Sequence, residues 1–149
     1  MNAGEICNRE VVIVNQESSI QEAAELMRKY HVGDVVVAEE RGEMRVPVGI
    51  ITDRDIVIEI VARNLEADEV LVGDAMSSDL LTATEEDEIL ETIKQMRGKG
   101  VRRIPVVNSA GGLEGIIAVD DLVDLLAEQM ADLVALITNE QRHERRNRS

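Results

Sequence analysis

The chain has 149 residues, enough for one compact domain or for two small halves that share a core. Tyr30 is the only aromatic residue, so the core must be aliphatic, and a bound base could not be stacked on Phe or Trp. The net charge of −14 argues against general binding to nucleic acid or to an anionic membrane, because repulsion would oppose approach.

The first half of the chain predicts the order β-α-β-β-α. Residues 10–15 form a strand buried on both faces, because four of them in a row are apolar. Ser18 or Ser19 then begins a helix that ends at Gly33. The inner face of that helix carries apolar residues at helical spacing: Ile20, Ala23, Ala24 and Met27. Strands at residues 35–38 and 46–51 follow, and a second helix reaches about residue 63.

The stretch Gly49-Ile-Ile-Thr-Asp-Arg-Asp55 joins the last of these strands to the second helix. One interpretation is structural: Thr52 caps the helix and Asp55 completes a capping box, which contributes about 1 kcal/mol. The other is functional, because the unpaired N–H groups at a strand-to-helix junction can hold a phosphate. Both interpretations are open at this point.

The second half repeats the pattern after an acidic connector at residues 64–74. Residues 80–83 form a strand, Thr84 to Asp87 forms a capping box, and a helix with an apolar face ends at Gly98 and Gly100. Strands at 104–107 and 115–118, joined by a turn, lead to a last helix from Asp120.

The two halves match piece by piece at an offset of 66 to 69 residues. Ile20 falls on Ile89, Val32 on Val101, and Gly49-Ile-Ile on Gly115-Ile-Ile. Two copies are too few for a solenoid, and each copy alone is too small for a good core. We therefore expect the copies to pack face to face about a pseudo-twofold axis.

This repeat resembles the cystathionine-β-synthase (CBS) domain, on the strength of Gly49-Ile-Ile-Thr-x-x-Asp55 and of the Arg103-x-Pro-Val type of run on the middle strand. Two copies in tandem resemble the CBS pair, or Bateman module. The expected fold is α+β: repeat 1 at residues 6–66, a connector at 67–75, repeat 2 at 76–134, and the end of the last helix with a basic tail at 135–149.

The resemblance implies a cleft that binds an adenosine-containing ligand, AMP, ADP or ATP, with S-adenosylmethionine or NAD as further possibilities and no required cofactor. It implies that Asp55 contacts the ribose hydroxyls and Thr52 a phosphate, which suits a carboxylate that accepts two hydrogen bonds. Arg102 and Arg103 match positions that face the phosphates, although a solvated surface pair is the alternative. Apolar residues would hold the adenine: Val12, Val14, Val48, Ile104 and Pro105.

The second copy departs from the motif. Ala118 stands at the position of Thr52, whereas Asp121 keeps the carboxylate of Asp55. Gly33 and Asp34 stand at the positions of Arg102 and Arg103. We therefore expect a second, weaker cleft at Asp121, Ala118 and Asp34, which is empty or accepts a nucleoside or a cationic ligand, because Asp34 would repel a phosphate.

The last helix carries an apolar stripe with the spacing 4, 3, 4, 3, 4: Val119, Val123, Leu126, Met130, Leu133 and Ile137. This surplus of apolar surface predicts a homodimer formed through helices of both repeats and the last helix. The alternative is a helix covered entirely by its own domain. We expect the basic tail from Asn139 to Ser149 to fray.

The sequence indicates no catalytic site. Cys7 has no partner for a disulfide, which indicates a reducing, cytoplasmic location, and Cys7 with His31 lacks a third orienting group for nucleophilic chemistry. Two histidines and one cysteine do not form a conventional zinc site, so we expect no metal. The start of the chain lacks the pattern of a secretion signal, and no apolar run is long enough to span a membrane.

The leading hypothesis is a regulatory module that senses an adenine nucleotide and acts on an unknown protein target in another chain. The alternative is a dimeric structural or interaction protein whose clefts are vestigial. The Ala118 and Asp34 positions favour that alternative.

Overall fold

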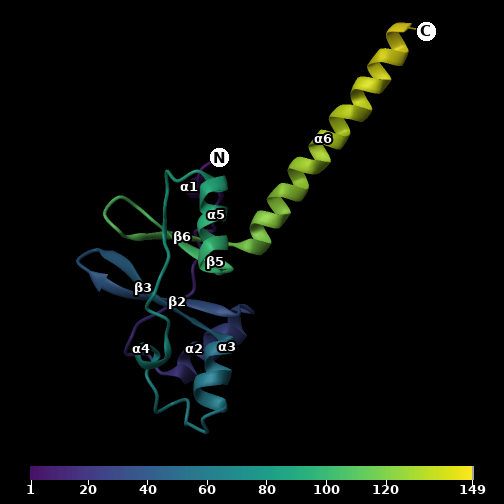
Figure 1. The fold of residues 1–149 in the computed structure, drawn as a ribbon. Helices are drawn as coiled ribbons and strands as arrows, with labels where there is room; N and C mark the ends of the chain where they lie inside the picture. Colours follow the sequence, from purple (N-terminus) through teal and green to yellow (C-terminus); the bar gives the residue numbers. More distant parts are fainter. Residues whose placement is uncertain (149) are drawn as a thin grey trace. The chain divides into compact units, whose positions relative to one another are not determined.

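The computed structural model describes residues 1–148 (Figure 1). The first half of the chain contains α1 (Ala3–Ile6), β1 (Ile13–Val14), α2 (Ile20–Tyr30), β2 (Asp34–Arg41), β3 (Met44–Thr52), α3 (Asp53–Ile56) and the π-helix η1 (Val57–Val61). The second half contains α4 (Val72–Ala75), β4 (Ala83–Thr84), α5 (Ile89–Lys99), β5 (Arg103–Val107), β6 (Leu113–Ala118) and α6 (Val119–Arg148). The chain forms two compact units, Met1–Ile117 and a second one that begins at Ala118.

Each half builds a three-stranded sheet, with the strand orders β1-β2-β3 and β4-β5-β6. The short β1 runs parallel to β2, and β2 runs antiparallel to β3. Likewise, β4 runs parallel to β5. A parallel pair needs a crossover connection, and α2 and α5 supply it. The predicted α+β fold, two β-α-β-β-α repeats with a long C-terminal helix, is confirmed.

The core is aliphatic, as the composition requires. In the first repeat, β2 is buried on both faces, with Val35, Val36 and Val37 at most 1% exposed. The inner face of α2 packs into the same cluster through Ile20, Ala23 and Met27. The equivalent positions of α5, Ile89, Thr92 and Met96, are buried in the second repeat.

The two equivalent helices end in the same backbone conformation, 69 residues apart. The helix α5 ends at Lys99, and Gly100 follows it in the left-handed region with φ 75°. The helix α2 ends at Tyr30, and His31 adopts the left-handed conformation with φ 54°. The prediction that Gly33 ends α2 is therefore wrong, since a non-glycine residue, His31, takes the position that Gly100 takes in the second copy.

Of two predicted helix starts, the one at Ser19 is confirmed and the one at Thr84 differs from the structure. The Ser19 side chain caps α2 by accepting a hydrogen bond from the Glu22 N–H at 3.1 Å. Thr84 and Asp87 do hydrogen-bond to one another, with the Thr84 N–H 2.9 Å from the carboxylate. However, α5 begins only at Ile89, so this pair closes the turn before the helix and does not cap it.

The leading segment of each repeat packs on the other repeat. The N-terminal segment hydrogen-bonds to the second repeat, with the Gly4 N–H 2.9 Å from the Glu85 carbonyl. In the equivalent way, the Gly73 N–H lies 3.0 Å from the Gln16 carbonyl of the first repeat. Figure 1 shows α1 beside α5, and α4 beside α2. The connector therefore contains a helical turn that ties the two repeats together.

The glycine of each Gly-Ile-Ile run is required by this exchange. A Cβ atom on Gly49 would lie 2.6 Å from the Ser77 carbonyl oxygen, because residues 76–77 cross the strand there. A Cβ atom on Gly115 would lie 2.8 Å from the Asn8 carbonyl oxygen for the same reason. Both distances are shorter than real Cβ contacts. The motif glycine is thus explained by chain packing, without reference to a ligand.

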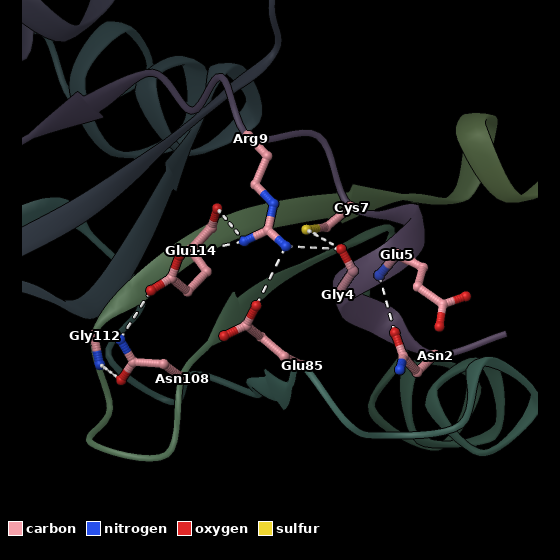
Figure 2. Close-up of polar contacts among 9 residues, drawn as sticks. All are labelled: Asn2, Gly4, Glu5, Cys7, Arg9, Glu85, Asn108, Gly112 and Glu114. Carbon is pink, nitrogen blue, oxygen red and sulfur yellow. Dashed lines mark hydrogen bonds and ion pairs between the residues drawn. The ribbon is translucent and has the colours of Figure 1, made fainter.

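Arg9 reinforces the contact between the N-terminal segment and the second repeat (Figure 2). Its guanidinium donates to the Gly4 carbonyl at 2.9 Å and pairs with the carboxylates of Glu85 and Glu114 at 3.2 Å each. Glu114 in turn accepts a hydrogen bond from the Asn108 side chain at 2.9 Å. This cluster joins the N-terminal segment to strand β6 and to the turn that precedes it.

The helix α6 is continuous over 30 residues, which corresponds to about 45 Å. The tail predicted to fray is therefore helical through Arg148, and Ser149 lies outside the described residues. Five of the six stripe residues are more than half exposed: Val123, Leu126, Met130, Leu133 and Ile137.

Candidate functional site

A cleft of about 580 Å³ is lined by residues of both repeats. The first repeat contributes the start of β2 and the junction from β3 to α3, which contains Thr52 and Asp55. The second repeat contributes the segment before β4 and the start of β5, which contains Arg102 and Arg103. The volume falls in the range of small-molecule sites in proteins, about 300–1,000 Å³. The four polar residues predicted to share a site thus line one cleft.

Thr52 and Asp55 form the capping box at the start of α3. The Asp55 N–H donates to the Thr52 hydroxyl, and the Thr52 N–H donates to the Asp55 carboxylate, each at 3.0 Å. The structural interpretation of the motif is therefore correct. It does not exclude a ligand, because a carboxylate has about four acceptor positions and the box uses one of them. The Thr52 hydroxyl also keeps a proton to donate.

Arg103 forms an ion pair with Asp34 inside the cleft. The two side chains are largely buried, with 29% of Arg103 and 15% of Asp34 exposed. Asp34 begins β2 and Arg103 begins β5, so the pair joins the two sheets. Asp34, which was predicted to serve a separate cleft with Asp121, thus lines the same cleft as Thr52 and Asp55.

The surroundings of Asp34 disfavour its charged form. Burial raises the pKa of the Asp34 carboxyl above its ordinary value, Arg103 opposes this rise, and Asp53 adds to it. A carboxylate that is removed from water pays for ionisation, and one adjacent cation compensates only in part. The charged form of Asp34 therefore depends on the neighbouring Arg103 guanidinium.

The charges on the cleft walls nearly cancel. Within residues 1–148, the lining includes four aspartates, at positions 34, 53, 55 and 79, and three arginines, at positions 54, 102 and 103. Lys99 also forms an ion pair with Asp79. The cleft is therefore not strongly basic, although Arg102 and Arg103 both line it.

The apolar wall differs from the predicted one. Ile104 is fully buried, and Pro105 is also among the fully buried side chains. Val12 and Val48 pack against the core of the first repeat, which includes Val14. The residues that supply apolar surface in the cleft are instead Ile50, Leu80, Leu81 and Val101. The internal repeat could have predicted these residues, because the second repeat supplies the apolar wall of the cleft that contains Asp55.

A second pocket is lined by first-repeat residues that are equivalent to the apolar wall residues of the second repeat. It has a volume of about 560 Å³ and is lined by Val11, Val12 and Val32, which lie 69 residues before Leu80, Leu81 and Val101. Tyr30 and Arg45 also line it. Ala118 ends β6, and Asp121 lies in the first turn of α6. Their predicted role in a second ligand cleft stays a prediction.

The remaining candidates give no sign of other chemistry. Burial raises the pKa of the Cys7 thiol, although Arg9 acts in the opposite direction, and a protonated thiol is a poor nucleophile. In the described part of the chain, no group of three His, Cys, Asp or Glu residues is placed to hold a metal ion. Among the same residues, no helix is both long and apolar enough to cross a bilayer.

Comparisons with known proteins identify the family and the fold. The CBS-domain family model matches residues 3–62 and again residues 72–128. An uncharacterized protein of Methanopyrus kandleri is 37% identical over 125 residues, which is 84% of this chain but only 62% of that protein. The CBS domain-containing protein YhcV of Bacillus subtilis is 32% identical over 113 residues, 76% of each chain.

Solved structures share the fold. The CBS domain protein PAE2072 from Pyrobaculum aerophilum, complexed with AMP, superposes with a TM-score of 0.73 and 27% sequence identity. The match covers 82% of this chain and 90% of that one.

Proposed function

The chain belongs to the CBS-domain family, as a tandem pair of these domains, and we propose that it is a regulatory module that binds an adenosine-containing ligand in the Thr52–Asp55 cleft. The observation that carries the proposal is that residues from both repeats line this one cleft. Thr52 and Asp55 come from the first repeat, and Arg102 and Arg103 come from the second.

Each part of such a ligand has a matching partner in the cleft. The Asp55 carboxylate has acceptor capacity for the ribose hydroxyls, and the Thr52 hydroxyl can donate to a phosphate oxygen. Arg102 and Arg103 supply cationic donors. The apolar wall of Ile50, Leu80 and Leu81 suits a base that no aromatic residue can stack on. PAE2072, which has the same fold and was solved with AMP, supports an adenine nucleotide as the ligand.

Regulation would follow from the position of the cleft. A ligand that contacts residues of both repeats favours the arrangement of the repeats in which all of its contacts are made. The family match assigns residues 3–62 and 72–128 to CBS domains. We therefore propose that the module acts on a protein target in the cytoplasm and carries out no reaction itself.

A structural or interaction protein is the competing function. The ion pair between Asp34 and Arg103 favours it, because a cleft whose arginine is already paired resembles a packing contact. Ligand binding distinguishes the two. The protein has one Tyr and no Trp, so a copurified nucleotide would dominate its ultraviolet spectrum.

A thermal-shift screen with AMP, ADP, ATP, S-adenosylmethionine and NAD tests the proposal directly. A ligand at 100 times its Kd stabilises the folded state by about 2.7 kcal/mol. Asp55→Asn keeps an acceptor oxygen for the Thr52 N–H but loses the carboxylate, so it should abolish the shift. Asp87→Asn is the matched control, because Asp87 makes the same kind of contact with Thr84 outside the cleft. If none of the five ligands raised the melting temperature, the adenosine-ligand proposal would fail and the structural or interaction function would be favoured.

We also propose that the chain forms a homodimer in which α6 pairs with α6 of a second copy. The stripe spacing of 4, 3, 4, 3, 4 reads the same in both directions, so an antiparallel pair places apolar residues opposite apolar residues. Charge favours this orientation. The helix carries five acidic residues and no basic residue before position 133, and its four arginines lie at positions 142, 145, 146 and 148. A parallel pair would place like charges side by side along the whole length.

A further inference from the structure

The ion pair in the cleft joins equivalent positions of the two repeats. Asp34 and Arg103 are 69 residues apart, which is the repeat offset, and each begins the central strand of its sheet. Two copies that pack about a twofold axis bring equivalent residues together near that axis. The copies have therefore diverged to opposite charges at the position where they meet, and identical charges would repel one another there.

This contact restricts what Arg103 can offer to a ligand. An arginine that pairs with a buried carboxylate has fewer N–H donors free for a phosphate, and its charge is largely neutralised. The Asp34 carboxylate itself faces the space that the phosphate would approach. Each further negative charge on the ligand therefore meets a carboxylate as well as a guanidinium.

We propose that Asp34 sets the ligand charge that the cleft accepts, so that the site takes adenosine ligands with at most one phosphate group and discriminates against ADP and ATP. This inference rests on the proposed function and narrows its ligand class. By the same rule, neutral or cationic adenosine compounds should also be accepted, because they bring no phosphate charge toward Asp34. The near cancellation of wall charge points in the same direction, because only Arg54, Arg102 and Arg103 oppose four carboxylates in the cleft lining within residues 1–148.

The matched control is Asp79, another aspartate of the same cleft. Its side chain is 83% exposed and pairs with Lys99, whereas Asp34 is largely buried against Arg103. Asp34→Asn and Asp79→Asn remove the same formal charge from the same pocket. If only the total charge mattered, both substitutions would change ligand preference equally. If the pair with Arg103 matters, only Asp34→Asn releases a guanidinium for additional phosphates.

The experiment is isothermal titration calorimetry of adenosine, AMP, ADP and ATP against the full chain and its variants. We expect the wild-type protein to bind AMP more tightly than ATP. Asp34→Asn should tighten ATP binding on the order of tenfold relative to AMP, since a carboxylate is removed from the cleft and the Arg103 guanidinium is released for the additional phosphates. Asp79→Asn should change the ratio of the two Kd values by less than about threefold, because solvent and salt screen an exposed charge.

Arg103→Gln provides a second arm that does not depend on the first variant. It should weaken AMP binding, because it removes a guanidinium from the cleft wall. Far-ultraviolet circular dichroism and melting curves establish that each variant is folded.

The possible outcomes separate the two proposals. If AMP and ATP bind with the same ratio of Kd values in the wild type and in Asp34→Asn, or if Asp79→Asn has the same effect, the charge rule is wrong while the adenosine site stands. If no adenosine compound binds any variant at millimolar concentration, the proposed function fails, and the charge rule fails with it.

Discussion

The Asp34 carboxylate and the Arg103 guanidinium form an ion pair between the first residues of β2 and β5, the central strands of the two sheets. Because these positions are equivalent in the two repeats, the pair is a contact of the chain with its own second copy. It is at the same time part of the wall of the candidate ligand cleft. A contact between the repeats is thereby also part of a cleft wall.

The first prediction concerns pH. The folded-state pKa of Asp34 is raised by burial, and of the two nearby charges Arg103 lowers it whereas Asp53 raises it. The other charged groups of the cleft lining are Arg54, Asp55, Asp79 and Arg102. Between the ordinary value of 3.8 and the raised value, the folded state binds more protons than the unfolded state. The contribution of Asp34 to the free energy of unfolding therefore falls as the pH rises through this window.

Urea unfolding of the wild type and of Asp34→Asn at a series of pH values from about 4 to 7 measures this contribution. The difference, wild type minus variant, should decrease as the pH rises. A difference that stays constant, or one that increases with pH as for an ordinary salt-bridged aspartate, would contradict the burial of Asp34.

The second prediction concerns the loss of the cation. Arg103→Ala leaves Asp34 largely buried without its partner and should lower the free energy of unfolding at pH 7 by about 2 kcal/mol, since both groups keep some contact with water. Adding Asp34→Asn should restore part of this loss, because the unpaired charge is then gone. Urea unfolding of the two single variants and the double variant measures the coupling. Strictly additive effects would show that the pair does not stabilise the fold.

The third prediction concerns the glycine of the motif. Gly49→Ala places a Cβ atom 2.6 Å from the Ser77 carbonyl oxygen and should destabilise the fold by about 1–3 kcal/mol, because a backbone segment has to move. Gly98→Ala is the control. Gly98 lies within α5 with no atom within 4 Å of an added Cβ, so alanine there should stabilise the helix by up to about 1 kcal/mol. Equal effects of the two substitutions on the melting temperature would rule out the packing explanation.

The fourth prediction concerns α6. Met130→Asp places a charge in the exposed apolar stripe and should convert the proposed homodimer to a monomer at micromolar concentration. Ala131→Asp adds the same charge on the neighbouring face of the same turn and should leave the dimer intact. Sedimentation velocity of both variants and the wild type measures this. A monomeric wild-type protein would refute the dimer.

Disulfide cross-linking measures the orientation of the two α6 helices in the proposed dimer. In a Cys7→Ser background, chains with Val123→Cys and chains with Leu133→Cys should form a disulfide with one another on oxidation, because these positions lie opposite each other in the antiparallel pair. A parallel pair would instead link Val123→Cys chains to themselves.

The local elements and the internal repeat were determined by the sequence alone. The helical spacing of Ile20, Ala23 and Met27 identified the buried face of α2, and Thr52 with Asp55 identified a capping box. These features depend on residues within one or two turns of each other, so local hydrogen bonding and periodicity are sufficient to predict them. The match of Gly49-Ile-Ile to Gly115-Ile-Ile established the duplication, because an internal repeat is read directly from the order of the residues.

Contacts between the two copies were decided only by the tertiary structure. The sequence placed Asp34 in a separate cleft with Asp121 and assigned Val12 and Val14 to the apolar wall, whereas Asp34, Leu80 and Leu81 line the cleft of Thr52 and Asp55. Both differences arise because each repeat faces the other copy, so the partner of a motif residue lies far from it in the chain. The pairing of Asp34 with Arg103 depends on how two sheets pack, and no spacing within one repeat encodes that distance.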